Sequence, residues 1–174
     1  MDINLRQITE SDTANIVRWR NSDDVKHWLY SQRELTPEMH LGWLKNVVAK
    51  GYCAQYIIVA KNKNEVFDIG TTFIKRSEPD SKSGEFGIFI GEKKARGKHC
   101  ALPATTEMLS IGFRELNLDS IFLTVFTENT PAIKTYLAAG FQIIEKFDYV
   151  DDPQRKIFKM EIFKDSFLSR NVSE

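Results

Sequence analysis

The stretch ARGKHCALPA, residues 95–104, joins a strand-like segment to a helix-like one and so decides the fold that we expect. GEFGIFIG, residues 84–91, precedes it and has the apolar character of a strand. Apolar residues follow it at the seven-, four- and three-residue spacings of one helix face: Leu102, Leu109, Phe113 and Leu116. Pro103 fits the first turn, because an amide there has no intrahelical partner. We therefore predict a strand, a basic loop and a helix that begins at Cys100 or Ala101.

The segments on either side extend this pattern to a complete α+β domain. Alternating or continuous apolar runs predict further strands at residues 3–8, 55–61, 66–75, 120–126, 141–147 and 155–163. Helical spacings predict helices through residues 14–21, 36–48 and 130–139. The order is strand, two helices, three strands, helix, strand, helix and two strands. We expect a single domain with one mixed, mostly antiparallel sheet flanked by helices.

Capping residues mark where the predicted helices begin and end. Thr36 and Pro37 open the second helix, whose apolar face is expected to be Met39, Trp43 and Val47. Thr130 is the expected cap of the last predicted helix, with Pro131 at its first position. Gly140 is the residue expected to end that helix.

Composition excludes several classes of protein. The 174 residues fit one domain, which we place at 1–168 with a polar tail at 169–174. Lys plus Arg equals Asp plus Glu at 24 each, so no overall field would hold the chain on nucleic acid or an anionic membrane. Cys53 and Cys100 lack zinc-site spacing, and no run is long enough to span a bilayer. We expect a cytoplasmic protein without a metal site.

The basic loop is suited to binding a pyrophosphate. A helix that starts at Cys100 or Ala101 directs free amides and the positive end of its dipole toward one point, and Arg96 and Lys98 add cations there. The alternative is an exposed basic turn whose charges face water. A nucleotide-hydrolysing P-loop fits worse, because His99 stands where a magnesium-binding Ser or Thr is needed.

Two segments together resemble the acetyl-coenzyme A binding core of the GNAT superfamily of N-acetyltransferases. IGEKKARGKHCALPATTEML, residues 90–109, is similar to the family's Arg/Gln-x-x-Gly-x-Gly/Ala loop and helix, with His99 in place of the middle glycine. The second segment matches without a gap at Asn129, Ala132, Tyr136, Gly140 and Phe141. The resemblance implies an acetyl-CoA site between splayed parallel strands, built from these residues: Phe89, Ile90, Arg96, Gly97, Lys98, His99, Cys100, Ala101, Asn129 and Ala132.

The resemblance also implies direct attack of an amine on the acetyl thioester. A backbone amide near Phe89 or Ile90 is the expected donor to the thioester carbonyl. Tyr136 is the candidate proton donor to the departing thiolate, because its phenol has a pKa of about 10; the alternative is a tyrosine that only packs its ring. Glu85 is the candidate base for the amine's proton, with a solvated acid at a strand end as the alternative.

The acceptor is expected on the side of the first two helices. Within the branch that acetylates ribosomal-protein N-termini and amino-sugar nucleotides, WRNS (19–22) and HLGWL (40–44) look closest to the nucleotide-sugar acetyltransferases of pseudaminic-acid type pathways. The resemblance therefore implies an amino-sugar nucleotide as the acceptor. Arg20 could pair with the phosphates of such an acceptor, and His40 could bind it; alternatively Arg20 holds a loop by bonding backbone carbonyls, and His40 packs beside Trp43. A protein N-terminus or a polyamine is the alternative acceptor. A non-catalytic acetyl-CoA binding module is the other class, and the branch suggests a homodimer.

Overall fold

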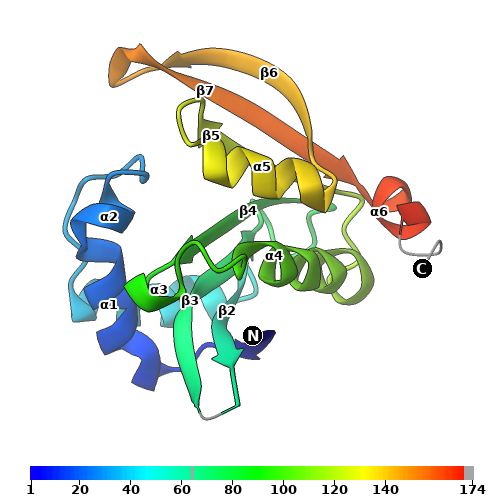
Figure 1. The fold of residues 1–174 in the computed structure, drawn as a ribbon. Helices are drawn as coiled ribbons and strands as arrows, with labels where there is room; N and C mark the ends of the chain where they lie inside the picture. Colours follow the sequence, from blue (N-terminus) through cyan, green and yellow to red (C-terminus); the bar gives the residue numbers. More distant parts are fainter. Residues whose placement is uncertain (64, 171–174) are drawn as a thin grey trace.

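The computed structural model describes residues 1–63 and 65–170, in which seven strands form one mixed sheet in the order β1-β2-β3-β4-β5-β7-β6 (Figure 1). Six α-helices lie in the same part of the chain. The strands are β1 (Asp2–Gln7), β2 (Cys53–Lys61), β3 (Val66–Lys75), β4 (Ser83–Ile90), β5 (Ser120–Phe126), β6 (Gln142–Tyr149) and β7 (Asp152–Phe163). The helices are α1 (Thr13–Asn21), α2 (Asp23–Lys26), α3 (Pro37–Trp43), α4 (Ala101–Ser110), α5 (Thr130–Ala139) and α6 (Lys164–Arg170).

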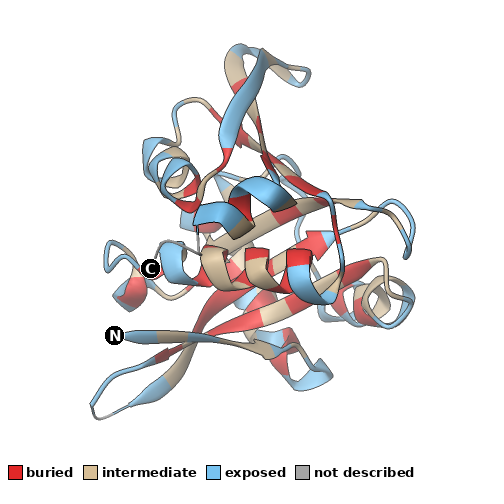
Figure 2. Ribbon diagram, turned by 90° about the vertical axis from the view of Figure 1, so that its right-hand side faces the viewer, coloured by how far each residue is buried: buried red, intermediate tan, exposed pale blue. Residues whose placement is uncertain are grey.

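Helices cover both faces of the sheet, and β2 shows why. Successive side chains of a strand point to opposite faces. Ile57 packs with Ile16 and Trp19 of α1, whereas Ile58 packs with Ala104 of α4, and both isoleucines are fully buried. Figure 2 shows the same division, with buried residues along the sheet and exposed ones on the outer sides of the helices. The apolar centre of β2 is thus buried on both sides.

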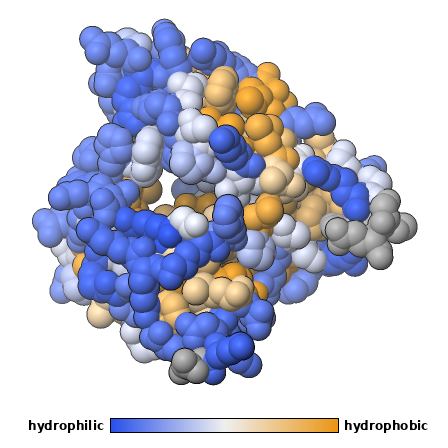
Figure 3. Space-filling view, in the orientation of Figure 1, coloured by the Kyte–Doolittle hydropathy of each residue, from blue (hydrophilic) through white to orange (hydrophobic). Residues whose placement is uncertain are grey.

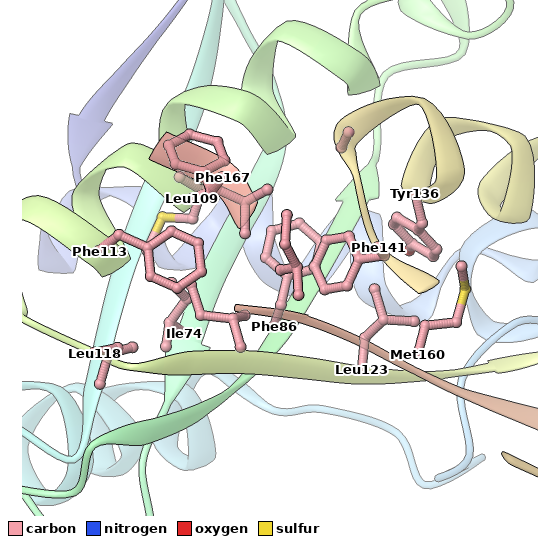
Figure 4. Packing of buried hydrophobic residues seen from close by; sticks show 14 of the residues in the cluster. Ile74, Phe86, Leu109, Phe113, Leu118, Leu123, Tyr136, Phe141, Met160 and Phe167 are labelled. Atoms are coloured by element: carbon pink, nitrogen blue, oxygen red, sulfur yellow. The ribbon is translucent and has the colours of Figure 1, made fainter. Parts of the chain in front are cut away.

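The core on the side of α4 and α5 is rich in aromatic rings (Figure 4). Phe86 of β4 meets Tyr136 of α5 with ring centroids 6.0 Å apart, and Phe141 lies 5.9 Å from each of them. Phe113 packs against Phe167 at 5.2 Å, which fastens α6 to the helix that follows the basic loop. These contacts fix α5, and with it Tyr136, against the strand β4.

The strands β4 and β5 pair over a short stretch and then separate, as the resemblance implied; the gap between them is called the opening below. Neighbouring strands from β1 to β4 are antiparallel, as are β5–β7 and β6–β7. Between β4 and β5 the pairing is parallel and covers Ser83–Glu85 and Ser120–Phe122 alone. Beyond Glu85, β4 continues beside β3 while β5 continues beside β7. The α+β class, the mixed sheet and the splayed parallel strands are all confirmed.

Three local predictions are corrected by the structure. The cap of α5 is Asn129, one residue earlier than predicted, because its side chain accepts from the Ala132 amide at 3.3 Å. The buried face of α3 is formed by His40 and continues at Leu44, whereas Met39 is exposed. The helices α2 and α6 were not predicted, and α6 includes two residues of the expected tail; residues 171–174 lie outside the described residues.

Candidate functional site

The free edge of β4 supplies backbone amides to the opening. The Gly91 amide donates to Ile69 O at 2.7 Å, so the backbone of Gly91 faces β3. Along an antiparallel strand, the backbone groups of successive residues point alternately to one neighbouring strand and to the other. The backbone of Phe89 therefore also faces β3, whereas the amides of Ile88 and Ile90 point to the opposite edge of β4, where β5 is no longer paired. Of the two amides predicted to bond the thioester carbonyl, the ladder therefore favours Ile90.

Arg96 holds the basic loop in shape rather than extending into solvent. Its Nε donates to Ile90 O at 3.0 Å and its Nη2 to Gly91 O at 3.1 Å. Its Nη1 donates to Asp24 Oδ2 at 2.7 Å, which ties the loop to α2. The guanidinium closes the loop at the end of β4, so any direct contribution of Arg96 to a ligand is expected from its backbone.

The loop turns through two residues with left-handed backbone angles, Gly97 with φ 70° and His99 with φ 58°. A side chain at Gly97 would meet no atom within 4 Å, so only the backbone angle calls for glycine there. His99 thus adopts a backbone angle that glycine takes more readily, at the place where the resembled loop has its middle glycine. Both Lys98 and His99 are exposed, and a phosphate contact of either remains a prediction.

The helix α4 begins at Ala101, as predicted, and its first amides have no side-chain cap. Cys100 occupies the cap position, but its side chain makes no hydrogen bond to the first turn, and Pro103 brings no amide of its own. The Cys100 sulfur is buried, 3.6 Å from Ala95 O, and burial raises the pKa of its thiol. Uncapped amides at a helix start are a site for an anion, to which Cys100 contributes backbone rather than sulfur.

The two catalytic candidates lie at the opening, on opposite faces of the sheet. Tyr136 belongs to the aromatic core of α5 and β4 (Figure 4), and burial raises the pKa of its phenol. Glu85 is half-buried at the last parallel pair of β4 and β5. It alternates with Phe86, which faces the core beneath α5, so its side chain emerges toward α1 and α2. The roles of both residues remain predictions.

Near the opening, on the side of α2, the molecule has a hollow of about 790 Å³. Figure 3 shows the surface hollowed between the region of α2 and that of α5. The lining comes from the segment after α2 and from the turn between β6 and β7: His27, Leu29, Tyr30, Ser31, Gln32, Tyr149, Asp151, Asp152 and Arg155. No sequence motif marked these residues, since they come together only when two segments over 100 residues apart meet; the Tyr149 hydroxyl, for example, donates to Tyr30 O.

The hollow is acidic although the chain as a whole is neutral. Asp151 and Asp152 line it, and the one lining guanidinium, that of Arg155, is already paired with Glu128 at 2.6 Å. The same guanidinium lies over the Phe126 ring, 3.3 Å from its centroid. The uncompensated charge on this surface is therefore negative.

Neither of the two residues predicted to bind the acceptor, Arg20 and His40, lines the hollow. Arg20 donates to Arg33 O at 3.0 Å and to Ser31 O at 3.4 Å, so it holds the segment after α2 as the alternative reading proposed. His40 is 3% exposed, and its Nδ1 is bonded to the Thr13 hydroxyl at 2.9 Å, between α3 and α1. The ring is enclosed between α3 and α1, and binding of the acceptor by His40 remains a prediction.

Residues 1–63 and 65–170 contain no group of three or more His, Cys, Asp or Glu side chains that could hold a metal ion. Within the same residues, no helix has the length and apolarity needed to cross a bilayer.

A family model described as the acetyltransferase (GNAT) domain matches residues 2–142. The chain belongs to this family. An uncharacterized protein of Methanocaldococcus jannaschii is 26% identical over 147 residues, 82% of this chain and 28% of that protein. An uncharacterized N-acetyltransferase, p20, of Bacillus licheniformis is 30% identical over 99 residues, 57% of this chain and 54% of that protein. The chain thus spans about a quarter to a half of these curated relatives.

The fold is also that of solved GNAT structures. Spermidine N-acetyltransferase from Vibrio cholerae, in complex with CoA and spermine, superposes with a TM-score of 0.84 at 20% identity, covering 95% of this chain and 98% of that one. A dodecameric structure of the Vibrio enzyme gives a TM-score of 0.78 at 20% identity, over 97% of each chain. At this identity the likeness establishes the fold.

Proposed function

We propose that this chain is an acetyl-CoA-dependent N-acetyltransferase whose acceptor is a cationic amine of the polyamine class. The observation that carries the activity is the single short parallel pairing of β4 and β5 among the described strands. It ends at Glu85, and β4 then leads directly into a loop and helix start with free amides. This arrangement offers one end of acetyl-CoA an anion site and the other end an opening between strands.

The proposed reaction needs two proton transfers, one on each face of the sheet. The acceptor ammonium loses a proton to Glu85, and the free amine attacks the thioester carbonyl, which is held by the Ile90 amide. The N–C bond forms, the C–S bond breaks, and the thiolate takes the phenolic proton of Tyr136. Because burial raises the pKa of Tyr136, the phenol stays protonated at neutral pH and is available as the donor.

The acidic hollow supports a polycation as the acceptor, in place of the amino-sugar nucleotide that the sequence favoured. Asp151 and Asp152 would attract a second ammonium group and repel a diphosphate. Arg20, which was expected to pair with that diphosphate, is bonded to loop carbonyls. The structural neighbour that acts on spermidine is consistent with the same choice. Cytoplasmic location and assembly into a homodimer remain proposals from the sequence, and the dodecameric neighbour supports self-association.

The acceptor is tested by measuring CoA release from acetyl-CoA with spermidine, a UDP-linked amino sugar and an N-terminal peptide. We expect turnover with spermidine, and Asp151→Asn and Asp152→Asn should each raise its KM about two- to fivefold at low salt. The exposed Asp165→Asn, on α6, is the matched control and should leave KM unchanged. Turnover with the amino sugar or the peptide alone would reject the polyamine acceptor. Binding of acetyl-CoA without turnover on any amine would favour a non-catalytic module.

A further inference from the structure

Tyr30 is held at the acceptor side of the opening by contacts to both its ring and its backbone. Its ring meets Phe126 of β5 edge-on, with centroids 5.0 Å apart, and lies 5.6 Å from the ring of Tyr149. The Tyr149 hydroxyl lies 3.0 Å from Tyr30 O, to which it donates. The next residue, Ser31, accepts from Arg20 at 3.4 Å. The side chain is therefore positioned before any acceptor arrives.

The Tyr30 ring packs on Phe126, and by alternation along β5 the side chains of Thr124 and Phe122 lie on the same face; Phe122 pairs with Glu85 where β4 and β5 separate. The Tyr30 hydroxyl interacts with the side chain of Thr124 on β5 and, electrostatically, with the carboxylate of Glu85 on β4. Burial raises the pKa of Tyr136, and the phenol of Tyr30 adds to that rise. Burial is the largest of several effects that together raise the pKa of Tyr30, so the phenol is neutral at pH 7 and can donate and accept hydrogen bonds. Tyr30 is 38% exposed and lines the hollow.

We propose that the Tyr30 hydroxyl binds the reacting amine of the acceptor and holds it beside Glu85, an inference that rests on the proposed function. The acceptor ammonium has three N–H groups, of which one faces the carboxylate of Glu85 and a second donates to the Tyr30 oxygen. When Glu85 takes its proton, the bond to Tyr30 keeps the amine in place with its lone pair toward the thioester. Tyr30 itself neither gains nor loses a proton.

The test compares Tyr30→Phe with the wild-type protein, because phenylalanine keeps the ring contacts and removes the hydroxyl alone. With spermidine as acceptor we expect kcat/KM to fall about 10- to 100-fold, as for a lost hydrogen bond to a charged group. The affinity for acetyl-CoA, measured by calorimetry, and the melting temperature should be unchanged. Thr124→Val should lower kcat/KM in the same direction by a smaller factor. The half-buried Tyr52, changed to Phe, is the matched control and should behave as wild type.

The outcomes separate this inference from the function on which it rests. A Tyr30→Phe protein with wild-type kcat/KM for spermidine, beside an active wild type, would overturn the role of Tyr30 and leave the acetyltransferase proposal standing. A loss of acetyl-CoA affinity equal to the loss of kcat/KM would assign Tyr30 to shaping the donor site, and would also overturn it. A wild-type protein that acetylates no amine would reject both proposals.

Discussion

At the residue scale, the proposed reaction depends most on the buried phenol of Tyr136. Changing Tyr136 to Phe removes the proposed proton donor and keeps the ring among Phe86 and Phe141. We expect kcat to fall by about 100-fold, with little change in the KM for acetyl-CoA, because general acid catalysis contributes on this order. Steady-state kinetics checks both constants.

The pH profile provides an independent check of that assignment. Burial raises the pKa of Tyr136, so its protonated, donating form persists above the ordinary pKa of a phenol. Wild-type kcat should therefore show no loss from this group as the pH rises to about 10. Full turnover of the Tyr136→Phe protein at every pH would remove the assignment.

A second residue-scale prediction concerns stability at low pH. Burial would raise the pKa of Asp12, but hydrogen bonds from Arg6 at 2.6 Å and from the Thr9 amide at 2.8 Å outweigh it and hold the pKa below its usual value. Stability from this carboxylate is present above its unfolded pKa of about 4 and is lost as the pH falls through the lower folded value. Asp12→Asn should cost about 1–3 kcal/mol at pH 7.

That difference should shrink as the acidity increases. Urea unfolding of the wild type and of Asp12→Asn at pH 7, 5 and 3 measures this difference in the free energy of unfolding. Asp2→Asn, at the exposed first residue of β1, is the control. An Asp12→Asn cost that stays constant from pH 7 to 3 would contradict the ion-pair account.

At the element scale, the loop between β4 and α4 depends on its backbone angles rather than on its side chains. Gly97→Ala places a side chain at φ 70°, which costs about 1 kcal/mol and so about a fivefold loss of acetyl-CoA affinity. His99→Gly relieves the same constraint at φ 58° and should leave affinity within about twofold. Calorimetry with acetyl-CoA measures both. A tenfold loss in His99→Gly would instead assign phosphate binding to the imidazole.

The elements themselves could be predicted where a local signal was strong. Alternating and continuous apolar runs predicted every described strand, and Pro103 and Gly140 marked a helix start and a helix end correctly. The four-residue helix α2 has no room for a periodic signal. The face of α3 was predicted from apolarity, but His40 is buried there by its hydrogen bond to Thr13, which a single-helix pattern does not contain.

At the scale of the whole molecule, the predictable part of the site is the part that is continuous in sequence. The loop at 96–101 and the segment from Asn129 to Phe141 could be recognised because each is one short stretch. Tyr30, Asp151 and Asp152 could not, because the fold alone brings the segment after α2 to the β6–β7 turn. A net charge of zero likewise concealed an acidic hollow, because local charge depends on which residues meet.

The central claim is that free amides at the start of α4 bind the diphosphate of acetyl-CoA. Calorimetry with acetyl-CoA and with S-acetylpantetheine, which lacks the diphosphate and the nucleotide, tests it most directly. The account predicts acetyl-CoA affinity at least about 100-fold higher, since several charge-assisted hydrogen bonds are made by one ligand alone. Equal affinity for the two thioesters, or no heat with either, would contradict it.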